Sequence, residues 1–188
     1  MIRTLLIGGA LTLALAGAAA AQMVPPQPGM DPSTMPPPGV GAPMTAPQYI
    51  MAAAQSDQFE IQEGRIAESQ AQSPSLRKFG AMMIRDHTMT TKTLQNAIMS
   101  TGMPVPPPPP LRPDQIQMIA QLRATGGAEF DRTYVMQQMQ SHQQALMVQS
   151  SYARMGDAPA LRGAASQTVP IVKAHIAMLN QMQPGMGQ

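Results

Sequence analysis

The stretch from Ser73 to Gly102, SPSLRKFGAMMIRDHTMTTKTLQNAIMSTG, decides the fold. It opens with an N-cap serine followed by proline at the first helical position, and it ends with a glycine shortly before another proline. Between these signals, apolar and small residues recur at steps of three and four, as on one face of a helix. Leu76, Met83 and Leu94 lie on that face, and so does His87. The stretch therefore predicts one long amphipathic helix with a histidine on its inward side.

The same periodicity predicts helices on both sides of this stretch, at about 48–72, 113–123, 127–155 and 158–183. Pro170 lies inside the last of these and is expected to kink it or to loosen one turn. Short turns join most of the helices, and a proline-rich run over 104–110 predicts a stiff polyproline connection. Residues 48–183 are therefore expected to form an all-α, antiparallel four-helix bundle with one longer crossover.

The composition excludes several classes of function. The 188 residues include 20 Pro and 19 Met but no Cys, and the formal net charge is only +2. No basic field is available to attract nucleic acid, and no thiolate is available for a disulfide or a metal site. Aromatic residues make up 3% of the chain, which argues against a β-sandwich or barrel.

The N-terminus predicts export. Arg3 precedes an apolar run that ends in Ala19-Ala20-Ala21, so residues 1–21 are expected to be a cleaved signal peptide that directs the chain to a bacterial periplasm. The alternative is an uncleaved anchor, but the run is barely long enough to span a bilayer and no later segment is. Residues 22–47 predict a disordered Pro- and Met-rich linker, and 184–188 a disordered tail.

The chain also resembles a known family. The motifs that carry the resemblance are the stretch 53–64, Met83-Ile84-Arg85-Asp86-His87, Phe130-Asp131-Arg132-Thr133-Tyr134, and Ser141-His142. Over about 48–182 they resemble the bacterial family catalogued as domain of unknown function 4142, which commonly has Asp-His where this chain has Ser-His. The resemblance implies an exported, ferritin-like four-helix bundle, often labelled an outer-membrane protein, and no established reaction.

One histidine falls on each of three predicted helices, at or near the inward face. They are His87, His142 and His175, and Glu60 lies on the inward face of the first helix. One ligand per helix, converging in the interior, is how metal sites are built in such bundles. The alternative is a buried Glu–His hydrogen-bond network that fixes the helix register. Both interpretations require convergence of these four side chains, so convergence alone does not separate them.

Helix geometry predicts that convergence. Glu60 and His87 come level on either side of the first turn, His142 lies near the middle of its helix, and His175 comes within about one turn of His87 if their helices run in roughly the same direction. Asp57 and Asp86 are candidate supporting carboxylates around the ligands. Asp86, however, points about 100° away from His87 around their shared helix.

The residues argue against a di-iron centre and for a simpler site. Such centres need Glu-x-x-His pairs, whereas Ile84, Met139 and Val172 stand three residues before the histidines. A mononuclear site for copper, zinc or nickel fits the His and Glu donors better. No hydrolase or transferase motif is present, so an enzyme is not expected.

Two classes of function remain. The first is a non-catalytic periplasmic module, associated with the outer membrane in one version, that binds an envelope protein or a second copy of itself. The alternative is a protein that binds or buffers one transition-metal ion, copper or zinc, in the bundle core.

Overall fold

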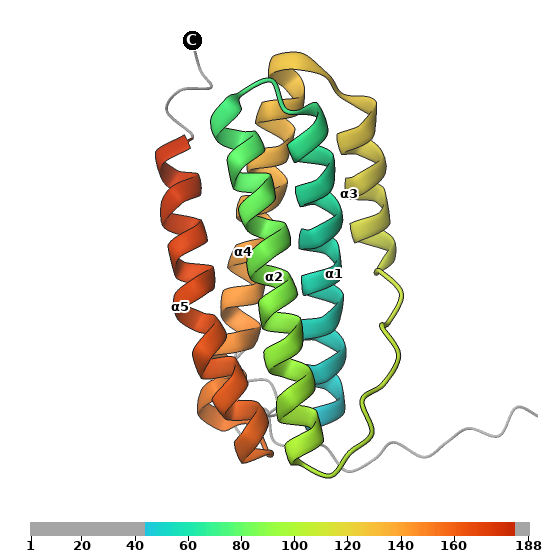
Figure 1. Ribbon diagram of the computed structural model, residues 1–188, viewed down its shortest axis with the longest axis vertical. Helices are drawn as coiled ribbons and strands as arrows, with labels where there is room; N and C mark the ends of the chain where they lie inside the picture. The colour runs from blue at the N-terminus through green and yellow to red at the C-terminus, as the bar shows by residue number, and fades with distance from the viewer. Residues whose placement is uncertain (1–43, 183–188) are drawn as a thin grey trace, which may run out of the picture. The chain divides into compact units, whose positions relative to one another are not determined.

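The computed structural model describes residues 44–182, all of whose regular structure is helical. The helices are α1 (Ala46–Gln70), α2 (Pro74–Ser100), α3 (Pro113–Ala124), α4 (Gly127–Met155) and α5 (Pro159–Met182). Four long helices pack into a bundle, and the short α3 lies against α1 and α4 (Figure 1). This confirms the predicted all-α, four-helix bundle. The predicted signal peptide, nearly all of the predicted linker and the predicted tail lie outside the described residues.

Local signals in the sequence set the helix ends. Helix α1 begins inside the stretch predicted as linker, where the Gln48 side chain accepts a hydrogen bond from the Thr45 N–H. Helices α2, α3 and α5 each begin at a proline, whose missing N–H costs nothing at the first helical position. Pro170 does not end α5, which continues through it to Met182.

The direction of each helix follows from contacts at the two ends of the bundle. The Asp131 carboxylate at the start of α4 accepts from the backbone N–H groups of Gln72 and Ser73, in the α1–α2 turn. At the opposite end, Asp157, in the α4–α5 turn, accepts from the N–H of Ala46 at the start of α1. Neighbouring long helices are therefore antiparallel throughout: α1 and α5 ascend in Figure 1, and α2 and α4 descend.

This arrangement corrects one step of the sequence argument. The helices that carry His87 and His175 do not run in the same direction, because α2 and α5 are antiparallel neighbours. The two histidines still come level, because each lies well inside its helix, away from both ends. His87 and His175 therefore lie at a similar depth in the bundle, as predicted, although the assumed direction of their helices was wrong.

The core consists of two apolar clusters, one at each end of the bundle. One cluster includes Phe79, Phe130 and Leu179, and the other includes the stacked rings of Tyr49 and Tyr152, whose centroids are 3.9 Å apart. Buried polar side chains from all four long helices lie in the layer between the clusters. Among the described residues, no helix combines the length and the hydrophobicity needed to cross a bilayer.

Candidate metal centre

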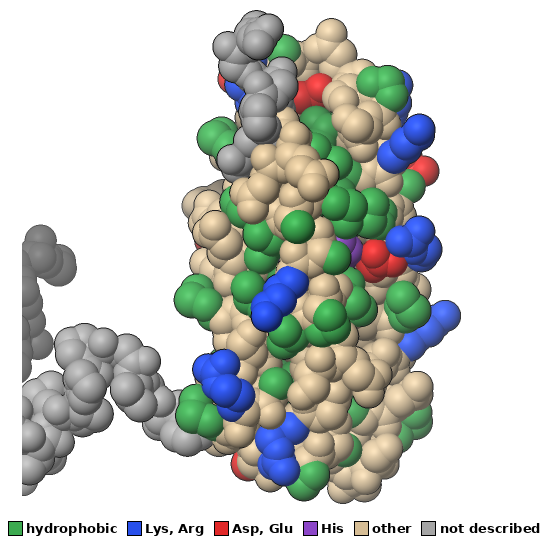
Figure 2. All heavy atoms as spheres, turned by 90° about the vertical axis from the view of Figure 1, so that its left-hand side faces the viewer, with side chains coloured by type: hydrophobic (Ala, Val, Ile, Leu, Met, Phe, Trp, Pro, Cys, Tyr) green, Lys and Arg blue, Asp and Glu red, His purple; other side chains and the backbone are tan. Residues whose placement is uncertain are grey.

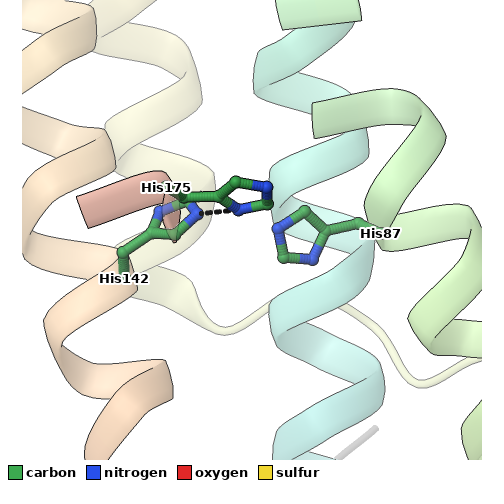
Figure 3. Close-up of side chains that lie close together, drawn as sticks. All are labelled: His87, His142 and His175. Atoms are coloured by element: carbon green, nitrogen blue, oxygen red, sulfur yellow. Dashed lines mark hydrogen bonds between the residues drawn. The ribbon is translucent and has the colours of Figure 1, made fainter. Parts of the chain in front are cut away.

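The polar layer contains all three histidines of the chain. His87 on α2, His142 on α4 and His175 on α5 are each 2% exposed or less. Their ring centroids are 5.1 to 5.6 Å apart, and one ring nitrogen from each lies within 4.8 Å of those of the other two. Figure 3 shows the three rings facing one another across the bundle interior. The expected convergence of the imidazoles is therefore present in the structure.

Helix α1 fixes the orientation of His87. The Nδ1 atom of His87 lies 2.9 Å from Oδ1 of Asp57, and the hydroxyls of Thr90 and Thr91 also donate to that carboxylate. Because a carboxylate only accepts, the Nδ1 atom carries the proton. The Nε2 atom points toward the other two rings and has no hydrogen-bond partner (Figure 3).

The outer nitrogens of the other two histidines also have acceptors. In His142, Nδ1 lies 2.8 Å from the backbone carbonyl of Gln138, one turn earlier in α4. In His175, Nε2 lies 3.0 Å from Oδ2 of Asp86 on the neighbouring α2. Since both partners accept, each outer nitrogen donates, as in the arrangement in which a carboxylate or carbonyl orients a metal-bound histidine.

The inner nitrogens of His142 and His175 face each other directly. Nε2 of His142 and Nδ1 of His175 are 3.1 Å apart, and each bears a lone pair once the outer nitrogen of a neutral ring carries the hydrogen. Two facing lone pairs repel, so with both outer hydrogen bonds kept, this contact is favourable only with a cation between the two nitrogens. Either one of the two rings takes up a proton or a metal ion binds both nitrogens. The free Nε2 of His87 is directed at the same place.

The pKa values of His142 and His175 disfavour an added proton between their inner nitrogens. Burial lowers the pKa of His142, and the nearby charge of Glu60 only partly offsets this effect. Burial likewise lowers the pKa of His175 to about 4, in spite of its hydrogen bond to Asp86. Both rings are therefore neutral near pH 7, which is the form that binds metals.

His87 behaves in the opposite way. Burial alone would lower its pKa, but the hydrogen bond to Asp57 and the charges of Asp57, Glu60 and Asp86 outweigh burial, so the pKa lies above its ordinary value. A metal ion at Nε2 must therefore displace a proton from this ring more often than from the other two.

Asp86 illustrates how a carboxylate can serve a neighbouring helix. It supports His175 across the α2–α5 contact, while Arg85 holds its other oxygen at 2.8 Å. Burial would raise the pKa of Asp86, but Arg85 and His175 outweigh burial and lower it. Its side chain is 12% exposed, and on the face seen in Figure 2 a histidine is visible beside acidic and basic side chains. The polar layer comes close to the surface there.

Glu60 occupies a different place from the three inner nitrogens. Its Oε1 atom lies 3.7 Å from the outer nitrogen of His142, and its Oε2 atom accepts a hydrogen bond from the Gln138 side chain. The structure thus brings Glu60 to the edge of the histidine cluster. Asp57 contacts His87, and Asp86 contacts His175.

The sequence argument missed three residues of this layer, Glu63, Tyr134 and Gln138, which are 0% exposed. A signal for each was present. Glu63 follows Glu60 by three residues and therefore shares its helix face, and Tyr134 and Gln138 precede His142 by eight and four on the same face of α4.

Comparisons with known proteins agree with this architecture. Residues 32–182 match the family described as "Domain of unknown function (DUF4142)". Among solved structures, CopM in its Cu(II)-bound form is 22% identical with a TM-score of 0.62, covering 73% of this chain and 94% of that one. A DUF305 protein from Streptomyces coelicolor is 10% identical with a TM-score of 0.63, covering 74% and 90%. A comparison with curated proteins gives no match. At these identities the structural likeness concerns the fold.

Proposed function

The chain belongs to the DUF4142 family, and we propose that it binds one transition-metal ion, copper or zinc, at the inner nitrogens of His87, His142 and His175. One observation carries the proposal: three buried imidazoles present lone pairs to a common point while their outer nitrogens donate to fixed acceptors. A divalent ion at about 2.0–2.1 Å from each nitrogen removes the opposition between His142 and His175. Small side-chain movements suffice, because the three nitrogens already lie within 4.8 Å of one another.

Copper and zinc are the ions that this donor set favours. Imidazole suits both metals, and three histidines with one open position are a known zinc arrangement. The structural neighbour CopM has been solved with Cu(II), Cu(I) and silver bound, which supports copper as the first metal to test.

We propose a role in binding or buffering the metal in the periplasm, without catalysis. The three rings are buried to 2% exposure or less, so a substrate has no direct approach to an ion held between them. A buried ion with three fixed ligands is suited to retention, and Asp86, whose side chain is 12% exposed and paired with Arg85, is where the layer comes near the surface.

Titration calorimetry on the tag-free protein tests this proposal. The wild type should bind one Cu(II) or Zn(II) per chain. His175→Gln should weaken binding by more than about 100-fold, since even the loss of a supporting partner costs 10–100-fold. Tyr49→Phe is the matched control, because it removes a buried 2.8 Å hydrogen bond to Gln149 in the distant apolar cluster and leaves the histidines intact. Equal heats for the wild type and His175→Gln would leave the hydrogen-bond network as the role of the layer.

One further feature supports the first class of function, a module that binds a partner. A pocket of about 220 Å³ lies between α1, α3 and α4, and its walls include Ala52, Ser56, Gln115, Gln144 and Val148. Met118 and Met147 add apolar surface and Arg112 adds one positive charge, so the pocket suits an apolar ligand or an extended peptide with a polar or acidic group. Chemical-shift changes confined to this pocket on addition of envelope extract fractions would favour this second candidate, whereas shifts confined to the histidine layer would not.

A further inference from the structure

We propose a second cation site in the polar layer, lined by oxygen atoms of Glu60, Glu63, Tyr134 and Gln138, that takes a hard divalent cation of the Mn(II) type. This proposal goes beyond the histidine site. It uses different residues, different donor atoms and a different class of metal. Several side chains of this set have an oxygen without a hydrogen-bond partner in the described part of the chain.

Four buried oxygen atoms in this part of the layer lack partners. They are Oε1 of Glu60, Oε1 of Glu63, the Tyr134 hydroxyl and Oε1 of Gln138. Their side chains are 1% exposed or less. Buried polar atoms nearly always have a partner, because an unsatisfied one costs most of its desolvation energy. Four such atoms, on side chains grouped around the Gln138 amide, therefore point to a ligand that they could share.

The four side chains share one place between α1 and α4. The Gln138 amide nitrogen lies 2.6 Å from Oε2 of Glu60 and 3.0 Å from Oε2 of Glu63, so a single group bridges both carboxylates. Tyr134 is one turn before Gln138 on the same face of α4. The charges of Glu60 and Glu63 act on the Tyr134 hydroxyl, whose pKa burial and these two charges raise well above its ordinary value.

Charge balance gives the sign of the missing ligand. Within the described residues no Lys or Arg pairs with Glu60 or Glu63. The Gln138 amide bridges the two carboxylates, and Glu60 also lies 3.7 Å from Nδ1 of His142, whereas Glu63 has no histidine of this kind beside it in the described part of the chain. Burial and the neighbouring Glu60 raise the pKa of Glu63 well above its ordinary value, which reflects the cost of holding this second charge. A divalent cation would neutralise both carboxylates at once.

The donor chemistry gives the class of cation. Carboxylate, phenol and amide oxygens are hard donors that suit Mg, Ca and Mn, in contrast to the three imidazole nitrogens next to them. Ca(II) usually takes six to eight oxygens, more than this buried set offers. A smaller ion of the Mn(II) type fits better. The pattern also differs from the Glu-x-x-His pairs of di-iron bundles, since both glutamates come from one helix.

The experiment uses the full chain with the histidine site first filled with Zn(II), which is spectroscopically silent. Mn(II) is then titrated and free Mn(II) is followed by electron paramagnetic resonance. The wild type should bind one Mn(II) per chain. Glu63→Gln, which keeps the shape and removes the charge, should weaken this binding by about 100-fold, and Tyr134→Phe by about 10-fold, in line with the effect of removing ligands and their partners.

His175→Gln is the matched control, because it damages the histidine site without touching an oxygen donor. It should keep Mn(II) binding while losing Zn(II). Two variants are used because one of them could fail to fold. If Glu63→Gln unfolds, Tyr134→Phe still tests the site, since it keeps the aromatic ring that fills the core. Loss of Zn(II) binding in every protein, with Mn(II) binding retained, would refute the proposed function and leave this inference standing.

Three outcomes would overturn the inference. The first is no Mn(II) binding by the wild type at 1 mM Mn(II). The second is equal affinity in the wild type and Glu63→Gln. The third is an infrared band of a protonated carboxyl group that disappears in Glu63→Gln and is unaffected by Mn(II), because a proton would then occupy the place of the cation.

Discussion

His142 and His175 set the chemistry of this protein at the scale of single residues. Each donates its outer nitrogen to a fixed acceptor, so the 3.1 Å contact between their inner nitrogens cannot be an ordinary hydrogen bond between neutral rings. Burial lowers the pKa of both rings and discourages the proton that would resolve the conflict. The metal ion proposed above would remove this conflict by binding both inner nitrogens.

The lowered pKa of His175 predicts a pH-dependent stability. The pKa of His175, about 4, lies below the ordinary value of 6.5. As the pH falls from 6.5 toward 4, His175 therefore binds a proton in the unfolded chain but not in the folded one, and the folded state loses stability. This stabilising contribution is complete well above pH 6.5. Between pH 6.5 and 5, it should fall by about 1.5 kcal/mol, because the loss approaches 1.36 kcal/mol per pH unit only below pH 6.5.

The measurement is urea unfolding of the metal-free wild type and His175→Gln at pH 6.5 and 5. Only the difference between the two proteins is diagnostic, because Glu63 has a raised pKa and stabilises the folded state as the pH falls. The wild type should lose about 1.5 kcal/mol more than the variant over this range. Parallel losses in both proteins would show that His175 is protonated in the folded state.

Asp57 should set both the pKa of His87 and the metal affinity of the site. Asp57→Asn removes the charge that holds the pKa of His87 above its ordinary value, while burial remains, so this pKa should fall below 6.5. Metal affinity should also fall, by about 10–100-fold, because Asn orients the ring less firmly. NMR titration of the His87 ring and calorimetry with Zn(II) measure the two effects. Thr93→Ala, at a half-buried position of α2 where the hydroxyl donates only to the Met89 carbonyl, should change neither, and an unchanged His87 pKa in Asp57→Asn would refute the prediction.

At the scale of helices, the α1–α2 contact depends on two glycines. A Cβ atom at Gly64 would lie 2.7 Å from the carbonyl oxygen of Gly80, and one at Gly80 would lie 2.6 Å from that of Gly64. Both distances are too short for carbon against backbone oxygen. The helices can therefore approach this closely only without side chains at these positions, as the small residues on the predicted inward faces indicated.

Gly80→Ala should destabilise the bundle by about 2–3 kcal/mol, since overpacking of a tight core costs 1–3 kcal/mol and this neighbour is backbone. Gly163→Ala on α5 is the matched control, because nothing lies within 4 Å of its Cβ position. That change should stabilise the protein by about 0.5–1 kcal/mol through helix propensity. Thermal melts of the two variants compare these opposite signs, and a stabilising Gly80→Ala would contradict the packing described here.

Sequence periodicity predicted the elements and the inward histidines because both depend on geometry within one helix. Contacts between helices were less accessible. The angle of about 100° between Asp86 and His87 correctly separated them, yet it could not reveal that Asp86 faces His175 on α5. That pairing depends on the direction of α5 and on its distance from α2. The Gln138 bridge between Glu60 and Glu63 likewise required the register of α4 against α1.

At the scale of the whole molecule, the histidine layer joins two helical hairpins. His87 belongs to the α1–α2 hairpin, whereas His142 and His175 belong to the α4–α5 hairpin. The carboxylate of Asp131 also joins the hairpins at one end, and that of Asp157 at the other. A metal bound by all three rings would add a third connection at mid-height, where polar groups replace apolar packing.

Removal of the Asp131 connection should weaken the whole bundle. Asp131→Ala leaves the N–H groups of Gln72 and Ser73, whose hydrogen bonds are partly buried, without their acceptor, at a cost of at most about 1–3 kcal/mol for each group that water cannot reach. Denaturant unfolding measures the loss. Glu129→Ala, an exposed residue of the same turn of α4, is the control and should cost less than about 0.5 kcal/mol. Equal stabilities of the two variants would show that water replaces the carboxylate.

Metal binding should stabilise the fold as a unit, because the three ligands converge only when both hairpins are in place. An ion that binds the folded chain alone contributes about 2.7 kcal/mol at a free concentration of 100 times Kd, which for a bundle of this size raises Tm by on the order of 10 °C. The rise should shrink below neutral pH, since His87 has a raised pKa and a proton competes for its Nε2 atom. Calorimetric scans with Zn(II) at pH 8 and pH 6 measure the effect. His87→Gln, which leaves two ligands on the α4–α5 hairpin, should lose most of the stabilisation, and with it the dependence on pH. A rise of equal size in the wild type and His87→Gln would place the ion outside the layer that connects the hairpins.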